Sequence, residues 1–262
     1  MMRRQVDVWT AVAVLVAIGC GGKPDQASAT PDEGSPAPIQ VAQAPADAGA
    51  SGSGSIRGTI RFEGAAPAPQ KVKMDADPVC QQQHSSPVYT EEVVVTNGAL
   101  KNVFVYVKEG ASGGAQPPAG PVTLDQRGCW YMPHVFGIQV NQPLEIVNSD
   151  ATLHNVNAKP GANAPFNVAQ PMKGMKTTKK FAKPEMGVKF KCNVHPWMSA
   201  YAHVVPHAFF GVSGEDGSFT ISGLPAGTYT LEAWHEKLGT QTQQMTVGDG
   251  EAKSVEFAFK AQ

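Results

Sequence analysis

Four residues of this sequence are of types that bind copper and similar metal ions. Cys192, His195 and Met198 follow one another at three-residue intervals, and His154 lies upstream of them. Two imidazoles, one thiolate and one weakly bound thioether form the ligand set of mononuclear blue-copper electron-transfer sites. Zinc could also bind the cysteine and the two histidines, but it would leave Met198 without a role. The sequence therefore predicts a copper site made by His154, Cys192, His195 and Met198.

The residues before Cys192 predict how its side chain is aimed. Val188 and Phe190 alternate with Lys189 and Lys191, which is the pattern of a half-buried strand. Because side chains alternate across a strand, Cys192 shares the apolar face with Val188 and Phe190. We therefore expect the thiol to point into a core that excludes water, with His195 and Met198 in the loop that follows.

Motifs upstream of the ligand loop add a family resemblance. The chain carries Tyr131-Met132-Pro133, then Asn148-Ser149-Asp150, then His154-Asn155, and finally the Cys-x2-His-Pro-aromatic-Met loop that ends at Met198. In this order they resemble the cupredoxin family, and most of all its amicyanin type, over residues 129–205. The resemblance implies a Greek-key β-sandwich holding one type 1 copper. It also implies that Asn155 lies beside the ligands and ties the two ligand loops together.

The flanking segments are also predicted to be strands. Residues 206–262 contain Asp216-Gly217-Ser218-Phe219 and the run from Gly223 to Tyr229, which resemble the carboxypeptidase regulatory-like (transthyretin-like) domain, a smaller β-sandwich with no common catalytic set. Residues 56–128 read as N-terminal β-strands that pack on the core, with strands over 91–96 and 101–108 joined by an Asn-Gly turn. Their opening strand could pair with the C-terminal module. The predicted fold class is thus all-β.

Two further cysteines leave a choice open. Cys80 is followed by His84, and Cys129 by His134. Outside the cytoplasm a Cys80–Cys129 disulfide is the favoured interpretation, since neither spacing is a known metal motif. The alternative is a second site for zinc or copper formed by all four residues. His134 is expected to be an ordinary surface histidine, and the alternatives are a residue that supports the copper ligands or an exposed residue through which electrons leave.

The N-terminus predicts export and anchoring. Arg3 and Arg4 precede an apolar run that is too short to span a bilayer and that ends in small residues before Cys20. Residues 1–19 therefore resemble a bacterial lipoprotein signal peptide, with Cys20 as the lipidated residue. An ordinary secretory signal is the alternative. Residues 20–55 are rich in Gly, Pro, Ala and Gln, which predicts a disordered linker.

These features together predict a function. With a net charge of −1, the chain of 262 residues has no global charge that would attract nucleic acid. We expect a lipid-anchored blue-copper protein that carries single electrons in the cell envelope, facing the periplasm, to a periplasmic or membrane redox protein. The alternatives are a copper-delivery protein, or an envelope module that binds carbohydrate or protein around a structural metal. No open metal position or acid–base pair predicts an enzyme.

Overall fold

The computed structural model describes residues 52–111 and 116–261, and these residues are almost entirely β-structure. The all-β prediction is confirmed. The signal peptide, Cys20 and most of the linker lie outside the described residues. In chain order the elements are β1 Gly54–Glu63, α1 Pro78–Gln82, β2 Val95–Thr96, β3 Ala99–Leu100, β4 Phe104–Glu109, β5 Val122–Arg127, β6 Trp130–Met132, β7 Val135–Gln139, β8 Leu144–Asn148, β9 His154–Ala158, β10 Phe166–Gln170, β11 Lys176–Lys179, β12 Glu185–Lys191, β13 Ser199–Val205, β14 Phe210–Val212, β15 Ser218–Leu224, β16 Gly227–His235, β17 Gly239–Val247 and β18 Ala252–Lys260.

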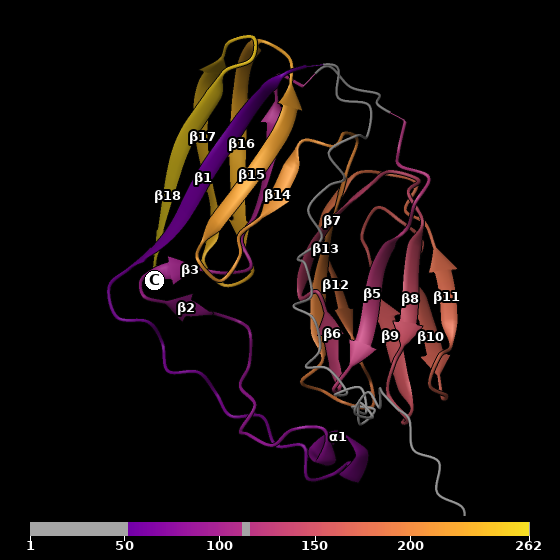
Figure 1. Cartoon of the computed structure of the whole chain (residues 1–262). Helices are drawn as coiled ribbons and strands as arrows, with labels where there is room; N and C mark the ends of the chain where they lie inside the picture. The colour runs from indigo at the N-terminus through magenta and orange to yellow at the C-terminus, as the bar shows by residue number, and fades with distance from the viewer. Residues whose placement is uncertain (1–51, 112–115, 262) are drawn as a thin grey trace, which may run out of the picture. The chain divides into compact units, whose positions relative to one another are not determined.

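Strands β5 to β13 form one β-sandwich, which we term the central sandwich (Figure 1). One sheet has the order β10-β9-β12-β13-β7, and the other has the order β11-β8-β5-β6. Strands that are distant in sequence lie side by side in it, such as β5 beside β8 and β7 beside β13, both pairs parallel. Its core includes Phe136, Ile146, Phe181 and Phe190, all buried. This arrangement confirms the two-sheet β-sandwich expected for the ligand-bearing residues.

The remaining strands form a second β-sandwich, the terminal sandwich, in which the first and last strands meet. β1 pairs in parallel with β18 along its length and antiparallel with β15, while the opposite sheet has the order β14-β4-β16-β17. The alternation from Ile56 places Ile56, Ile60 and Phe62 in the core of this sandwich. β1 begins at Gly54, two residues before the expected strand.

Residues 56–128 are divided between the two sandwiches. β1 to β4 belong to the terminal sandwich, whereas β5 belongs to the central sandwich, where it pairs with β6 and β8. The Asn97-Gly98 turn joins β2 and β3 with φ angles of 52° and 79°, as a two-residue hairpin turn requires. β2 spans only Val95–Thr96, so the strand expected from residue 91 is mostly irregular.

Residues 70–90, which we term the cap, leave the terminal sandwich after β1 and contain α1. The cap is closed by a bridge between Lys71 and Tyr89 and by hydrogen bonds from Val72 N to Val88 O and from Thr90 N to Gln70 O. All the described residues belong to one compact unit of the chain. Within the described ranges no helix is long and apolar enough to cross a membrane.

Candidate metal centre

Cys192 directly follows β12, and its side chain points into the central sandwich. Val188 and Phe190 are 2% and 0% exposed, while Lys189 and Lys191 lie on the solvent side. Cys192 itself is 3% exposed and is the free cysteine among the described residues. The predicted strand alternation is confirmed, and it places the thiol in the buried interior of the central sandwich.

The loop after Cys192 folds back on itself and brings its donors together. The backbone N–H of Cys192 donates to the carbonyl of Met198 at 3.2 Å, and the N–H of Met198 donates to the carbonyl of His195 at 2.9 Å. The N–H of His195 also points to the Cys192 sulfur at 3.4 Å. These bonds fix the backbone of all three residues, and His195 and Met198 are both buried.

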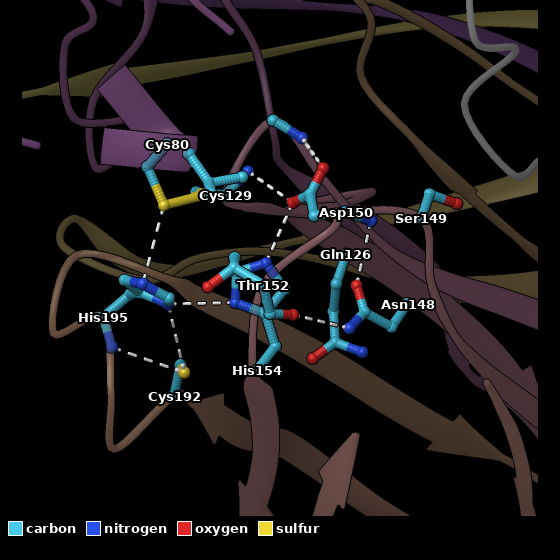
Figure 2. Close-up of polar contacts among 12 residues, drawn as sticks. Cys80, Gln126, Cys129, Asn148, Ser149, Asp150, Thr152, His154, Cys192 and His195 are labelled. Atoms are coloured by element: carbon cyan, nitrogen blue, oxygen red, sulfur yellow. Dashed lines mark hydrogen bonds and ion pairs between the residues drawn. A yellow bond between two sulfur atoms is a disulfide. The ribbon is translucent and has the colours of Figure 1, made fainter. Parts of the chain in front are cut away.

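His154, the first residue of β9, meets this loop from the neighbouring strand. Its Nδ1 lies 2.9 Å from Nδ1 of His195, and the latter lies 3.8 Å from the Cys192 sulfur. Figure 2 shows the three side chains converging. Their donor atoms all lie within 4.8 Å of one another. A metal ion bonded at about 2.0 Å to nitrogen and about 2.3 Å to sulfur holds its ligand atoms at comparable separations.

The opposite nitrogen of each imidazole contacts a carboxylate. Nε2 of His154 lies 2.9 Å from Asp150, and Nε2 of His195 lies 3.0 Å from Asp77. A carboxylate accepts a hydrogen bond, so both rings carry hydrogen on Nε2, and Nδ1 is the nitrogen of each ring that can offer a lone pair once any proton on it is lost. The two Nδ1 atoms face each other at 2.9 Å, an arrangement that needs a cation between their lone pairs, either the proton that His154 holds below about pH 8 or a metal ion that displaces it. The donor set therefore fits a metal ion on grounds of its own chemistry.

The two remaining predicted site residues are joined by hydrogen bonds to the segments that carry these donors. Met198 is fully buried in the same core cluster as Cys192. Oδ1 of Asn155 accepts a hydrogen bond from the backbone N–H of Asn193 at 2.7 Å and lies 3.5 Å from the Cys192 sulfur. Asn155 thus joins the strand that carries His154 to the loop that carries Cys192.

The surroundings also favour the ionised thiol. Burial by itself acts to raise the pKa of Cys192, but His154, His195 and nearby backbone groups outweigh it and lower that pKa to about 5. Burial acts to lower the pKa of His154, whereas its contacts with Asp150 and Cys192 raise it to about 8. Since thiolate is the form of cysteine that binds metals, the protein presents Cys192 ready for coordination near neutral pH.

Cys80 and Cys129 form a disulfide, with an S–S distance of 2.02 Å. Both sulfurs are therefore bonded to each other and are not thiolates that could bind a metal in this structure. The two histidines considered with them have other partners, since Nε2 of His84 contacts the carbonyl of Gly128 at 2.7 Å and His134 pairs with Glu236. The expectation that His134 is a surface residue is wrong. Its side chain is 4% exposed, because Glu236 of the terminal sandwich covers it.

Two carboxylates at this site were given no role from the sequence, although Asp150 is part of the Asn148-Ser149-Asp150 motif. Asp150 precedes His154 by four residues and accepts hydrogen bonds from the N–H groups of Gly128 and Cys129, both at 2.8 Å. Asp77 comes from the cap, where it is the N-cap residue of α1. An Asp-Pro pair is a common helix start, so this signal could have located α1 but not its contact with His195.

The C-terminal part of the chain matches a known family. Residues 203–260 match the carboxypeptidase regulatory-like domain, as the motifs of this segment predict. This region supplies β14 to β18 of the terminal sandwich. Comparison with curated protein sequences gives no significant match.

Solved structures similar to this chain include several cupredoxins. A copper(I) amicyanin variant is 19% identical, with 38% of this chain and 97% of that chain covered at a TM-score of 0.29. A purple cupredoxin from Nitrosopumilus maritimus is 19% identical, with 31% and 97% covered at a TM-score of 0.27. A copper-containing nitrite reductase from Thermus scotoductus is 25% identical, with 36% and 24% covered at 0.29. At these TM-scores the assignment of a metal rests on the donor atoms themselves.

Proposed function

We propose that the protein is a mononuclear copper protein that carries single electrons. The observation that supports this function is the buried cluster of His154 Nδ1, His195 Nδ1 and the Cys192 sulfur. Met198, which is buried and bonded through its backbone to Cys192 and His195, would complete the set of two His, one Cys and one Met. Copper, when bound, would supply a one-electron couple between Cu(II) and Cu(I).

The chain's own residues support electron transfer better than copper delivery. The side chains of His154, Cys192, His195 and Met198 are at most 3% exposed, and hydrogen bonds hold the loop from Cys192 to Met198 on both sides. A rigid, dry site needs little rearrangement when an electron enters or leaves. Release of the metal to an acceptor would require the cap to move away from His195 first. We expect no substrate turnover at this site.

The proposed setting is the cell envelope. The resemblance of residues 1–19 to a lipoprotein signal peptide supports an exported protein anchored at Cys20, and the Cys80–Cys129 disulfide suits an oxidising compartment. The partner would be a periplasmic or membrane redox protein. Labelling of Cys20 by a lipid precursor in cells, and its loss in Cys20→Ser, tests the anchor.

Copper reconstitution followed by visible absorption and EPR tests the metal assignment. We expect an intense thiolate-to-Cu(II) charge-transfer band, and we expect Cys192→Ser to lose it. Cys192→Ser is near the wild type in size, and the disulfide remains as a control for correct oxidation. Wild-type protein with reduced Cys192 that binds Cu(II) without such a band would exclude the proposal.

A substitution of the proposed ligand Met198 has a matched control elsewhere in the chain, at the exposed Met172. Met172 is 64% exposed, whereas Met198 is 0% exposed. We expect Met198→Leu to raise the reduction potential, because the oxidised metal loses a donor, while costing less than about 1.5 kcal/mol of stability. Met172→Leu should leave the potential unchanged. Equal potentials for Met198→Leu and wild type, measured by voltammetry, would remove Met198 from the ligand set.

A further inference from the structure

His195 is carried by a loop, yet its ring is 2% exposed. The atoms that cover its Nε2 side come from the cap, more than a hundred residues earlier in the sequence. Oδ2 of Asp77 lies 3.0 Å from Nε2, and the Cys80 sulfur lies 3.5 Å from the same nitrogen (Figure 2 shows the second contact). The cap is therefore in direct contact with a ligand of the proposed copper site.

The carboxylate of Asp77 is held in a fixed orientation. Its Oδ1 accepts hydrogen bonds from the backbone N–H groups of Val79 and Cys80, at 2.8 and 3.4 Å, as the N-cap of α1. Its Oδ2 accepts a hydrogen bond from the Thr152 hydroxyl at 2.8 Å. The disulfide from Cys80 to Cys129 ties α1 to the central sandwich three residues after Asp77, which restricts how far Asp77 can move from His195.

The carboxylate of Asp77 thus makes two kinds of contact: Oδ1 caps the N-terminus of α1, and Oδ2 contacts Nε2 of His195. By accepting a hydrogen bond from Nε2–H, it holds His195 in the tautomer whose Nδ1 faces Cys192 and His154. Asp150 does the same for His154, but Asp150 lies in a loop of the central sandwich, whereas Asp77 belongs to a segment outside it. A negative charge against a ligand imidazole also makes that ligand a stronger donor, which favours Cu(II) over Cu(I).

Resting on the proposed copper function, we infer that Asp77 is a positioning residue of the metal centre. It fixes the tautomer and orientation of His195 and lowers the reduction potential of the copper. The cap therefore contributes to the metal centre through this contact of Asp77 with His195.

The test compares Asp77→Asn and Asp77→Ser with Thr152→Val. Asn and Ser are both good N-cap residues, so α1 is retained. The single oxygen of Asn cannot serve the helix amides and Nε2 together, and Ser is too short to reach His195. Thr152→Val removes another hydrogen bond to the same Oδ2 but leaves the carboxylate in place, so it controls for general loosening of the cap.

Two measurements are made on each variant. The first is the tautomer of His195 in metal-free protein, read from nitrogen-15 NMR of the imidazole, and the second is the reduction potential after copper loading. We expect both Asp77 variants to lose the Nε2–H tautomer. Loss of such a partner typically weakens metal binding about 10-fold or more, and a 10-fold loss confined to Cu(II) raises the potential by about 59 mV. Thr152→Val should resemble the wild type.

The outcomes separate this inference from the proposed function. An unchanged tautomer and potential in Asp77→Ser would overturn the role of Asp77. Equal effects of Thr152→Val and Asp77→Ser would overturn it too, since loosening alone would then suffice. If the wild type takes up no copper, the copper function fails by itself, and the tautomer in metal-free protein still decides whether Asp77 positions His195.

Discussion

At the scale of single residues, protons and the metal ion compete for the same donor atoms. The pKa of His154 is raised to about 8, so below pH 8 its ring holds a proton that metal binding must displace. The pKa of Cys192 is lowered to about 5, so the thiol adds a second proton only below pH 5. We expect the apparent Cu(II) affinity to fall by about tenfold or more per pH unit from pH 8 to pH 5, and more steeply below pH 5.

Competition with a chromophoric chelator at a series of pH values measures this dependence. Asp150→Asn is the informative companion variant, because contact with Asp150 is what raises the pKa of His154 against the effect of burial. In that variant the fall should begin at a lower pH. An affinity that stays constant between pH 8 and pH 5 would contradict these protonation states of His154 and Cys192.

At the scale of elements, a buried ion pair joins the turn between β6 and β7 to the turn between β16 and β17. His134 and Glu236 have side chains 4% and 5% exposed. Burial acts to lower the pKa of His134, but Glu236 and other acidic groups outweigh it and raise that pKa. Burial likewise acts to raise the pKa of Glu236, and His134 outweighs it and lowers that pKa. The pair therefore links the two sandwiches as charged groups.

Glu236→Ala should lower the free energy of unfolding by about 3 kcal/mol, since it leaves a buried imidazole without its partner. The raised pKa of His134 gives stability that is complete below its unfolded pKa of about 6.5 and is lost as pH rises through the folded pKa. The lowered pKa of Glu236 gives stability that is complete above about 4.3 and is lost as pH falls. The difference from wild type should thus be largest between about pH 4.3 and pH 6.5.

Urea unfolding at about pH 5.5 and about pH 9, inside and above that window, measures this difference. The exposed pair of Arg61 and Glu256, 63% and 52% exposed, is the control, and Arg61→Ala should change stability by less than about 1 kcal/mol. A loss in Glu236→Ala no larger than that of Arg61→Ala would show that the buried pair does not stabilise the molecule.

At the scale of the whole molecule, local patterns predict the ligands but not what surrounds them. The direction of the Cys192 side chain follows from the alternation of the residues just before it. The spacing in the loop then predicts that His195 and Met198 belong to the same site. The contact of Asp77 with His195 joins parts of the chain whose proximity depends on the complete topology. The resemblance of the opening strand to the C-terminal module indicates that β1 could pair there, but not that its partner is β18 or that the pair is parallel. The short helix α1 has no periodicity long enough to be read from the sequence.

The Cys80–Cys129 disulfide stabilises the molecule as a whole. It closes a loop with a sequence separation of 49, and this loop includes strands of both sandwiches. A loop of this length corresponds to roughly 4 kcal/mol of stabilisation through the lost entropy of the unfolded chain. The Cys80→Ser, Cys129→Ser double variant should lose about this amount, and both sandwiches should unfold more readily. Urea unfolding with and without a thiol reductant measures it. Reductant should destabilise the wild type and leave the double variant unchanged; equal stability of oxidised wild type and double variant would contradict the argument.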